Sequence, residues 1–139
     1  MKTLAKVKFI KTKKGRELLF LPVRVNGKGP FEFALDTGSA VVCLSGETAS
    51  TLGIRGRKAK DTWGAGGQTV RRRLSKVKSI SIGRAVRRNL GVQILDFKGV
   101  GLNEHLERSI EGIIGIEFFE TYRMTIDCSR SELLLQKKS

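Results

Sequence analysis

The feature that most constrains the fold is a pair of strand-like segments, joined by a turn, that ends in a polar loop. In residues 17–26, β-branched and aromatic side chains accumulate, and residues 26–29 (NGKG) supply a turn. Residues 30–36 (PFEFALD) then alternate large apolar side chains with smaller or polar ones, so that one face packs inward. The sequence therefore predicts a β-hairpin that delivers the carboxylate of Asp36 at the end of its second strand.

Strand-like segments also dominate the remainder of the chain. The further strands that we predict lie at residues 41–44, 70–82, 86–97, 112–115, 122–128 and 132–136. Ser45 is suited to cap a short helix that stops at Gly53, and a second brief helix is predicted at residues 116–121. Residues 98–111 are loop-like, with a helical turn expected at 103–108. The sequence thus indicates an all-β fold with one or two short helices.

The size and composition of the chain fit one folded domain. It has 139 residues, of which 40% are hydrophobic and 29% charged, and no Pro-rich or Ser-rich linker divides it. We assign residues 1–16 to a basic N-terminal segment and residues 17–139 to the domain itself. The N-terminus carries lysines throughout, so it is not a secretory signal, and no apolar run is long enough to span a membrane. A cytoplasmic protein, or a piece cut from a larger one, is expected.

Cysteine and histidine are too sparse for a metal site. Cys43 and Cys128 lack a CxxC spacing and His105 is the only histidine, so a zinc site would lack its usual ligands. We expect two reduced, partly buried thiols and neither a metal nor another cofactor. A catalytic pair of a cysteine with His105 is formally open but disfavoured.

The chain is strongly basic. It carries 27 Lys and Arg against 13 Asp and Glu, a formal net charge of +14, which creates a potential that attracts nucleic acid, anionic lipid or acidic peptides. The cations often alternate with apolar residues, which is typical of a solvated outer face. One Trp and one Tyr offer few platforms for stacking bases. Nucleic-acid binding is therefore an alternative that the sequence does not favour.

A glycine-rich segment lies between two extended segments in the middle of the chain. Residues 61–69 (DTWGAGGQT) place Gly64, Ala65, Gly66 and Gly67 in succession. Such a run favours a mobile hairpin tip over the interior of an element. We therefore expect a flap, meaning a hairpin able to close over a ligand.

The order of these motifs resembles that of the single-domain retropepsin-like aspartic proteases, including the bacterial members related to gag-polyprotein proteases. The resemblance rests on LDTGSAVVCLS, then AGG in the hairpin, then SISIG, then EGIIGIEFFETYRMTIDCSRSELLL, and it spans residues 17–136. An Asp-Thr-Gly triplet alone is weakly specific, whereas two motifs in this order around a Gly-rich hairpin are strongly specific. The resemblance implies a closed β-barrel or sandwich with a flap, assembled as a homodimer.

The resemblance also implies a catalytic loop. Asp36 from each protomer would activate a water: one carboxylate takes its proton, and the other, protonated, donates to the substrate carbonyl. Thr37 would join the two loops through hydroxyl hydrogen bonds, and Gly38 would let the substrate backbone approach. Ser39 would hydrogen-bond the Asp36 carboxylate. The chain contains one such loop, so the complete site needs two copies related by a two-fold axis.

Substrate binding is expected from the flap and from one strand. The expected residues are Trp63, Gly64, Ala65, Gly66, Gly67 and Ile113. A packing role at the flap base explains Trp63 equally well, and a core role explains Ile113.

The sequence also departs from the family pattern. Ile116 stands where retroviral enzymes have an arginine, so we expect a different dimer interface, with residues 132–136 as a candidate. Cys128 replaces an aromatic residue that is common in the bacterial members. A structural role is favoured for Asp61, Asp96 and Asp127, which lie near strand ends or turns.

Three functions remain open from the sequence. The leading hypothesis is a homodimeric aspartic endopeptidase that cleaves peptide or protein substrates without a cofactor. The alternatives are a catalytically weak or inactive module of the same fold that binds peptides or dimerises, and a basic nucleic-acid-binding β domain.

Overall fold

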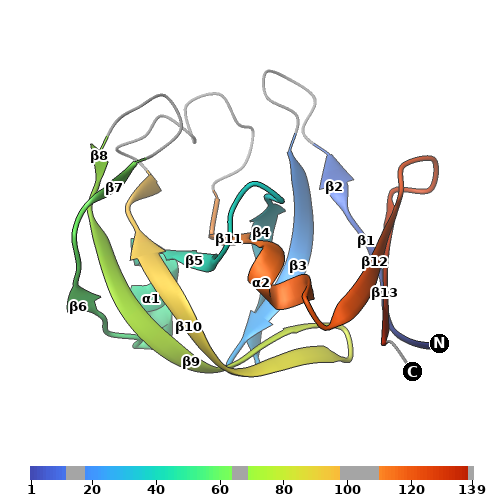
Figure 1. Cartoon of the computed structure of the whole chain (residues 1–139), viewed down its shortest axis with the longest axis horizontal. Helices are drawn as coiled ribbons and strands as arrows, with labels where there is room; N and C mark the ends of the chain where they lie inside the picture. Colours follow the sequence, from blue (N-terminus) through green and yellow to red (C-terminus); the bar gives the residue numbers. More distant parts are fainter. Residues whose placement is uncertain (12–17, 64–68, 98–109, 138–139) are drawn as a thin grey trace.

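Most of the chain forms β-strands, in the arrangement that Figure 1 shows. The computed structural model describes residues 1–11, 18–63, 69–97 and 110–137. Six strands close into a barrel, since β3 (Leu19–Val25) pairs with β4 (Lys28–Leu35) on one edge and with β9 (Arg72–Ile82) on the other. Between β4 and β9 the order continues through β11 (Gly112–Ile114), β5 (Val42–Ser45) and β10 (Ala85–Leu95). The prediction of an all-β barrel is therefore confirmed.

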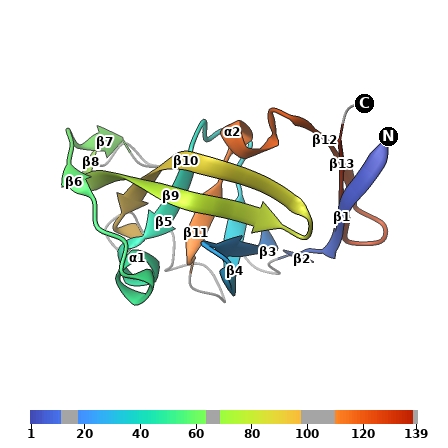
Figure 2. The same cartoon turned by 90° about the horizontal axis from the view of Figure 1, so that it is seen from below.

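Several short strands and two helices lie outside the six barrel strands. They are β2 (Ile10–Lys11) beside β3, β6 (Arg57–Lys58) beside β9, the hairpin of β7 (Thr62–Trp63) and β8 (Thr69–Val70), and the helices α1 (Gly46–Leu52) and α2 (Ile116–Phe119). Figure 2 shows α1 near one end of the molecule, while both chain termini lie at the opposite end. The expected helical turn at 103–108 lies outside the described residues.

The hairpin of β3 and β4 has the predicted tight turn. Asn26 and Gly27 have φ angles of 52° and 76°, a left-handed geometry that Asn and Gly adopt more readily than other residues. The Asn26 side chain also accepts hydrogen bonds from the backbone N–H groups of Lys78 (2.9 Å) and Ser79 (3.2 Å) on β9. The turn therefore fixes both the register of the hairpin and the closure of the barrel.

Helix α1 begins and ends where its sequence signals predict. The Ser45 hydroxyl oxygen accepts a hydrogen bond from the Thr48 backbone N–H (3.0 Å), which satisfies one of the free donors in the first turn. Gly53 ends the helix with a φ of 69°, a left-handed conformation that glycine adopts without penalty. The chain thereby leaves β5 in a fixed direction.

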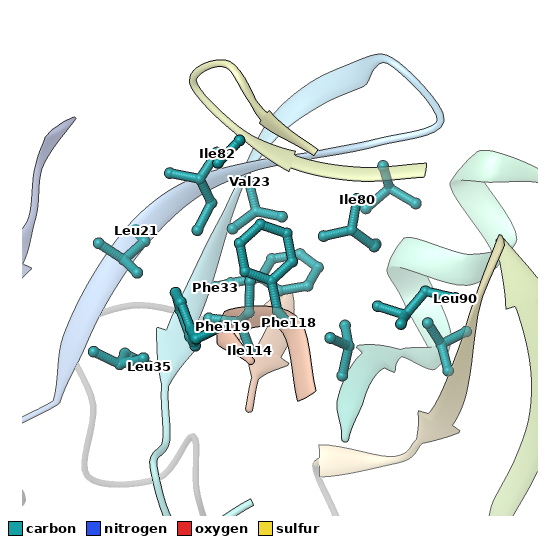
Figure 3. Close-up of a cluster of buried hydrophobic side chains, with 14 of the residues drawn as sticks. Leu21, Val23, Phe33, Leu35, Ile80, Ile82, Leu90, Ile114, Phe118 and Phe119 are labelled. Atoms are coloured by element: carbon teal, nitrogen blue, oxygen red, sulfur yellow. The ribbon is translucent and has the colours of Figure 1, made fainter. Parts of the chain in front are cut away.

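The barrel encloses one large apolar core, part of which Figure 3 shows. Phe33, Ile114 and Phe118 are all 0% exposed and come from β4, β11 and α2. Complete burial of such side chains stabilises a fold by roughly 1.5–3 kcal/mol each. Because α2 contributes to this core, the helix has a fixed position against the barrel.

A second sheet, in the order β1–β13–β12, packs beside the barrel. It consists of β1 (Lys2–Lys8), β13 (Glu132–Lys137) and β12 (Tyr122–Asp127), and its buried side chains Ala5, Leu133 and Leu135 belong to the main core. The sequence did not predict β1, which lies within the segment 1–16. The domain boundary at residue 16 stays a prediction.

Both edges of β13 are occupied, by β1 on one side and by β12 on the other. A further strand can therefore not pair with the backbone of β13. The free edges of this sheet belong to β1 and β12. The expectation that residues 132–136 contribute to a dimer interface stays a prediction.

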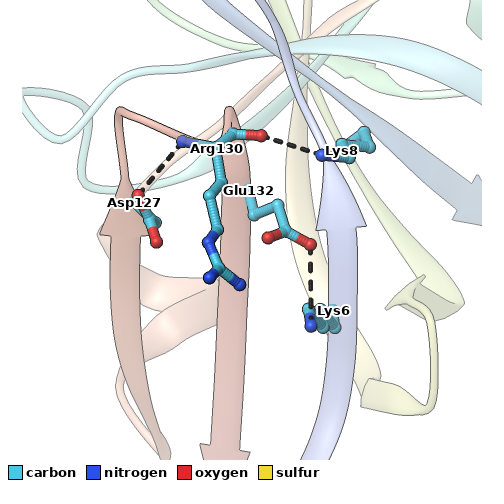
Figure 4. A network of polar contacts seen from close by, with 5 residues as sticks. All are labelled: Lys6, Lys8, Asp127, Arg130 and Glu132. Carbon is cyan, nitrogen blue, oxygen red and sulfur yellow. Dashed lines mark hydrogen bonds and ion pairs between the residues drawn. The ribbon is translucent and has the colours of Figure 1, made fainter.

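Polar contacts tie the sheet together at the β12–β13 turn, as Figure 4 shows. Lys6 Nζ lies 3.8 Å from Glu132 Oε2, and Lys8 Nζ donates a hydrogen bond of 2.9 Å to the Arg130 carbonyl. Both lysines belong to β1. The basic N-terminal strand is therefore held to the C-terminal hairpin by specific contacts as well as by its backbone pairing.

Asp127 organises that turn. Its Oδ1 accepts hydrogen bonds from the Ser129 hydroxyl (2.8 Å) and the Arg130 backbone N–H (3.1 Å). These bonds, with that from Ser129 the most important, hold the pKa of Asp127 below its ordinary value of 3.8, because they favour the ionised carboxylate. The contacts support the structural role that the sequence suggests for Asp127.

Two general findings concern the described part of the chain. None of its helices combines the length and apolar character needed to cross a membrane. Within the same residues, His, Cys, Asp and Glu side chains nowhere gather in a group of three or more that could hold a metal ion.

Candidate functional site

The loop that carries Asp36 leaves the barrel at the end of β4. The Asp36 backbone N–H donates to the Ile114 carbonyl (3.1 Å), which continues the parallel pairing of β4 with β11. The loop then turns, with the Ser39 N–H donating to the Asp36 carbonyl (3.1 Å). Asp36, Thr37 and Gly38 are exposed. The sequence prediction that a strand delivers this carboxylate to the surface agrees with the structure.

The Asp36 carboxylate is held by its own loop. The Gly38 backbone N–H donates a hydrogen bond of 2.9 Å to Asp36 Oδ1. This bond fixes one carboxylate oxygen and leaves the other available to a ligand. A carboxylate that is positioned in this way and open to solvent can accept a proton from a water.

The expected bond from Ser39 to Asp36 is not the one that forms. The Ser39 hydroxyl donates its proton to the Val41 carbonyl at 3.0 Å. Because a hydroxyl has one proton to donate, it is not available to the Asp36 carboxylate in this arrangement. Ser39 instead stabilises the path of the loop toward β5.

The N-terminus of α2 fastens the far side of the loop. The backbone N–H of Ile116 donates to the Ser39 carbonyl and that of Glu117 to the Ala40 carbonyl, both at 2.9 Å. At Gly115 the two backbones approach so closely that an added Cβ would lie 2.4 Å from the Ser39 oxygen and 2.5 Å from that of Val41. Only glycine permits this close approach of two backbones, and at Gly115 it holds α2 against the Asp36 loop.

Arg87 holds α2 in turn, a role that the sequence did not reveal. Its guanidinium Nη1 donates to the carbonyls of Glu117 and Phe118, the latter at 3.2 Å. The neighbouring Tyr122 hydroxyl donates to the Val86 carbonyl at 2.7 Å. Arg87 therefore connects β10, through α2, to the loop of Asp36. In the sequence it is one cation of a basic stretch, and no local signal distinguishes it.

A small apolar cluster lies next to the loop, and we call it the site floor. It consists of Phe20, Ala34, Cys43, Phe97 and Ile110, with Ile113 packed against them. Ile113 pairs with Ala34 on one side and with Cys43 on the other, which places it in the strand beside the Asp36 loop. Ile113 is half-buried, so part of its side chain remains accessible to a ligand.

The Cys43 thiol is unreactive, although it lies in the site floor beside the Asp36 loop. Burial raises the pKa of its thiol to about 12, and the nearby negative charge of Asp36 adds to the effect, while contact with the Ser39 side chain opposes it. The group is therefore a neutral thiol at pH 7 and a poor nucleophile. This finding argues against a catalytic cysteine at Cys43, and His105 lies outside the described residues.

The hairpin that we expect to act as a flap is paired at its base. Thr62 pairs with Val70 and Trp63 with Thr69, as two extended segments around a tip require. The tip residues Gly64, Ala65, Gly66 and Gly67, and the side chain of Trp63, lie outside what the structure describes. Their assignment to substrate binding stays a prediction.

The chain is similar to known proteins in sequence and in structure. A family model described as aspartyl protease matches residues 21–118, more than half of the chain. A retropepsin-like aspartic protease from Rickettsia conorii has a TM-score of 0.61 and 19% identity, and the match covers 97% of this chain and 95% of that one. Comparison with curated proteins gave no significant sequence match.

Two further structures share the fold. EIAV protease complexed with the inhibitor HBY-793 has a TM-score of 0.52 and 21% identity over 76% of this chain and 86% of that one. The retroviral protease-like domain of Ddi1 from Leishmania major has a TM-score of 0.55 and 14% identity, covering 88% and 94%. At these identities the likeness establishes the retropepsin-like fold.

Proposed function

Because this chain belongs to the aspartyl protease family, we propose that it is an aspartic endopeptidase whose active site forms between two identical chains. The observation that carries the proposal is the exposed Asp36, with one carboxylate oxygen held by the Gly38 N–H on a loop fastened by α2. A rigidly positioned carboxylate at the surface is what an enzyme that activates water requires.

The chemistry calls for a second carboxylate. One Asp36 is ionised and takes a proton from water, and the water oxygen attacks the carbonyl carbon of the scissile bond. The other Asp36, protonated, donates to the carbonyl oxygen; collapse of the tetrahedral intermediate then breaks the C–N bond, and the leaving amine takes a proton. The sequence contains one Asp-Thr-Gly loop, so symmetry supplies the partner.

The surface around the loop supports self-association. Ile116 is 42% exposed and is one of three large hydrophobic residues that are exposed among those the structure describes. Its backbone N–H donates to the Ser39 carbonyl of the loop. A second chain that brought its Asp36 to this loop would cover Ile116. Thr37 would then hydrogen-bond across the two-fold axis.

We propose that a peptide substrate binds beside the same loop. The substrate would lie extended over the site floor, with Ile113 against one of its side chains and the flap residues Trp63 and 64–67 above it. Closure of the flap would exclude water from the reacting bond.

The proposal is tested by peptide hydrolysis with wild-type protein and the Asp36→Asn variant. We expect the variant to lose cleavage while it keeps its fold and its dimer, and a statine-type transition-state analogue to inhibit the wild type. Asp127→Asn is a matched control, since it removes a carboxylate at the β12–β13 turn, and it should retain cleavage. Cleavage that survives in Asp36→Asn would overturn the proposal, whereas peptide binding without cleavage by the wild type would favour an inactive binding module.

A further inference from the structure

A cavity of about 480 Å³ lies at the base of the flap hairpin, outside the site described so far. Its charged lining residues are Lys58, Asp61, Arg71, Arg72, Arg73 and Asp96. Four of these residues are cationic and two are acidic, so the lining has a formal net charge of +2. The volume falls within the range of small-ligand pockets.

The arginines of this basic pocket are available to a ligand. The ion pair found among the described residues joins Lys6 to Glu132 and involves neither Arg71 nor Arg73. Arg72 Nε donates to the Lys60 carbonyl, which fixes that side chain against the segment leading to the flap. Guanidinium groups in such a cluster suit a carboxylate, which accepts two hydrogen bonds from one arginine.

The remaining lining is partly apolar. Ile94, which is 2% exposed, and the half-buried Leu95 come from the end of β10. A side chain that combines methylene groups with a terminal carboxylate would contact both kinds of surface. Glutamate has this combination, and aspartate has a shorter version of it.

The pocket lies along the path of an extended peptide. Cys43, in the site floor, pairs with Ile113, whose other strand neighbour is Ala34, two residues before Asp36. β5 ends at Ser45, and the next residue, Gly46 of α1, lines the pocket, three residues or roughly 10 Å from Cys43. Asp96 of the pocket adjoins Phe97 of the site floor. Since an extended peptide also advances about 3.3 Å per residue, a residue about three positions from the scissile bond would reach the pocket.

We propose that the basic pocket binds an acidic side chain of the peptide substrate, about three residues from the scissile bond. The inference rests on the proposed protease function. In a symmetric dimer the pocket occurs twice, once on each side of the scissile bond, so acidic residues on either side are accommodated. The strong positive charge of the chain thereby acquires a specific role in selecting substrates.

Cleavage of a peptide library, followed by mass spectrometry, identifies the cleaved bonds. Synthetic peptides built on the best site then carry Glu, Gln or Lys at each nearby position. We expect wild-type kcat/KM to be about fivefold higher for Glu than for Gln about three residues from the bond, with a smaller ratio at high salt. Arg71→Glu should abolish or reverse that preference.

Lys76→Glu is the matched control, because it makes the same charge change at an exposed position of β9 outside the pocket. It should leave the ratio of Glu to Gln peptides unchanged. Equal ratios in Arg71→Glu and Lys76→Glu, or equal kcat/KM for Glu and Gln peptides at every position in the wild type, would overturn the inference.

A binding measurement separates failure of the pocket from failure of catalysis. Fluorescence anisotropy of labelled peptide pools, one with Glu and one with Gln, is measured on Asp36→Asn protein with and without Arg71→Glu. If the protein binds the Glu pool more tightly and Arg71→Glu removes this preference, the role proposed for the pocket is supported, even if no variant cleaves a peptide. Equal binding of both pools refutes the pocket even if the wild type is an active protease.

Discussion

Gly115 is the position where one added methyl group would disturb the Asp36 loop most directly. Its ideal Cβ would lie 2.4 Å from the Ser39 oxygen and 2.5 Å from the Val41 oxygen, about 1 Å inside ordinary van der Waals contact. Both neighbours are backbone atoms, so no side chain can rotate away. In Gly115→Ala the loop or the start of α2 has to move.

The cost of that movement has two parts. Overpacking a tight site costs about 1–3 kcal/mol. A shift of about 1 Å also weakens the bonds from Ile116 N–H to Ser39 and from Glu117 N–H to Ala40, both 2.9 Å long, at about 0.5–1.5 kcal/mol each. We therefore expect Gly115→Ala to lower the free energy of unfolding by about 2–6 kcal/mol and to reduce kcat more than a loss of stability alone explains.

Urea denaturation followed by tryptophan fluorescence, together with peptide hydrolysis well below the unfolding transition, measures both effects. Gly91→Ala on β10 is the control, because nothing lies within 4 Å of its Cβ. That change should be neutral or stabilising by up to about 1 kcal/mol. If Gly115→Ala unfolds like Gly91→Ala and retains full kcat, the close fit of α2 to the Asp36 loop contributes neither to stability nor to activity.

Three further perturbations follow from the structure. Iodoacetamide should alkylate the exposed Cys128 in native protein and reach Cys43 only after unfolding, since Cys43 is buried with a pKa of about 12; native alkylation of Cys43, seen by mass spectrometry, would contradict this. The interactions that lower the pKa of Asp127 stabilise the fold above pH 3.8, and this stabilisation is lost as the pH falls through the folded-state pKa. Ser129→Ala should therefore lower the Tm at pH 7 but leave it unchanged below that pKa. Ile116→Glu should raise the concentration needed for half-maximal activity about tenfold or more, and sedimentation should show weaker self-association, whereas an unchanged profile would exclude Ile116 from the interface.

Local chemistry explains why much of the fold could be predicted from the sequence. The turn at Asn26 and Gly27 and the two ends of α1 at Ser45 and Gly53 depend on the preferences of a few adjacent residues. The alternation of apolar side chains before Asp36 likewise reports one buried strand face. These signals need no knowledge of distant segments, so they fix the strand that presents Asp36.

The missed contacts depend on distant parts of the chain. The Ser39 hydroxyl could serve either Asp36 or Val41, and the route of the loop toward β5 decides for Val41. In the sequence, Arg87 resembles the arginines of a solvated face. Its role depends on the packing of β10 against α2, which places two carbonyls at its guanidinium. The strand β1 was missed because its alternating lysines resemble a solvated segment. Its partner, β13, lies at the opposite end of the sequence.

The most direct test of the central claim, that Asp36 is half of an active site, is a mixing titration. Wild-type chains are combined with Asp36→Asn chains at constant total concentration, allowed to exchange, and assayed for peptide hydrolysis. If both carboxylates are needed, activity follows the square of the wild-type fraction, so an equal mixture retains about one quarter of full activity. Activity proportional to the wild-type fraction, about one half in an equal mixture, would mean that each chain works alone and would contradict the shared site.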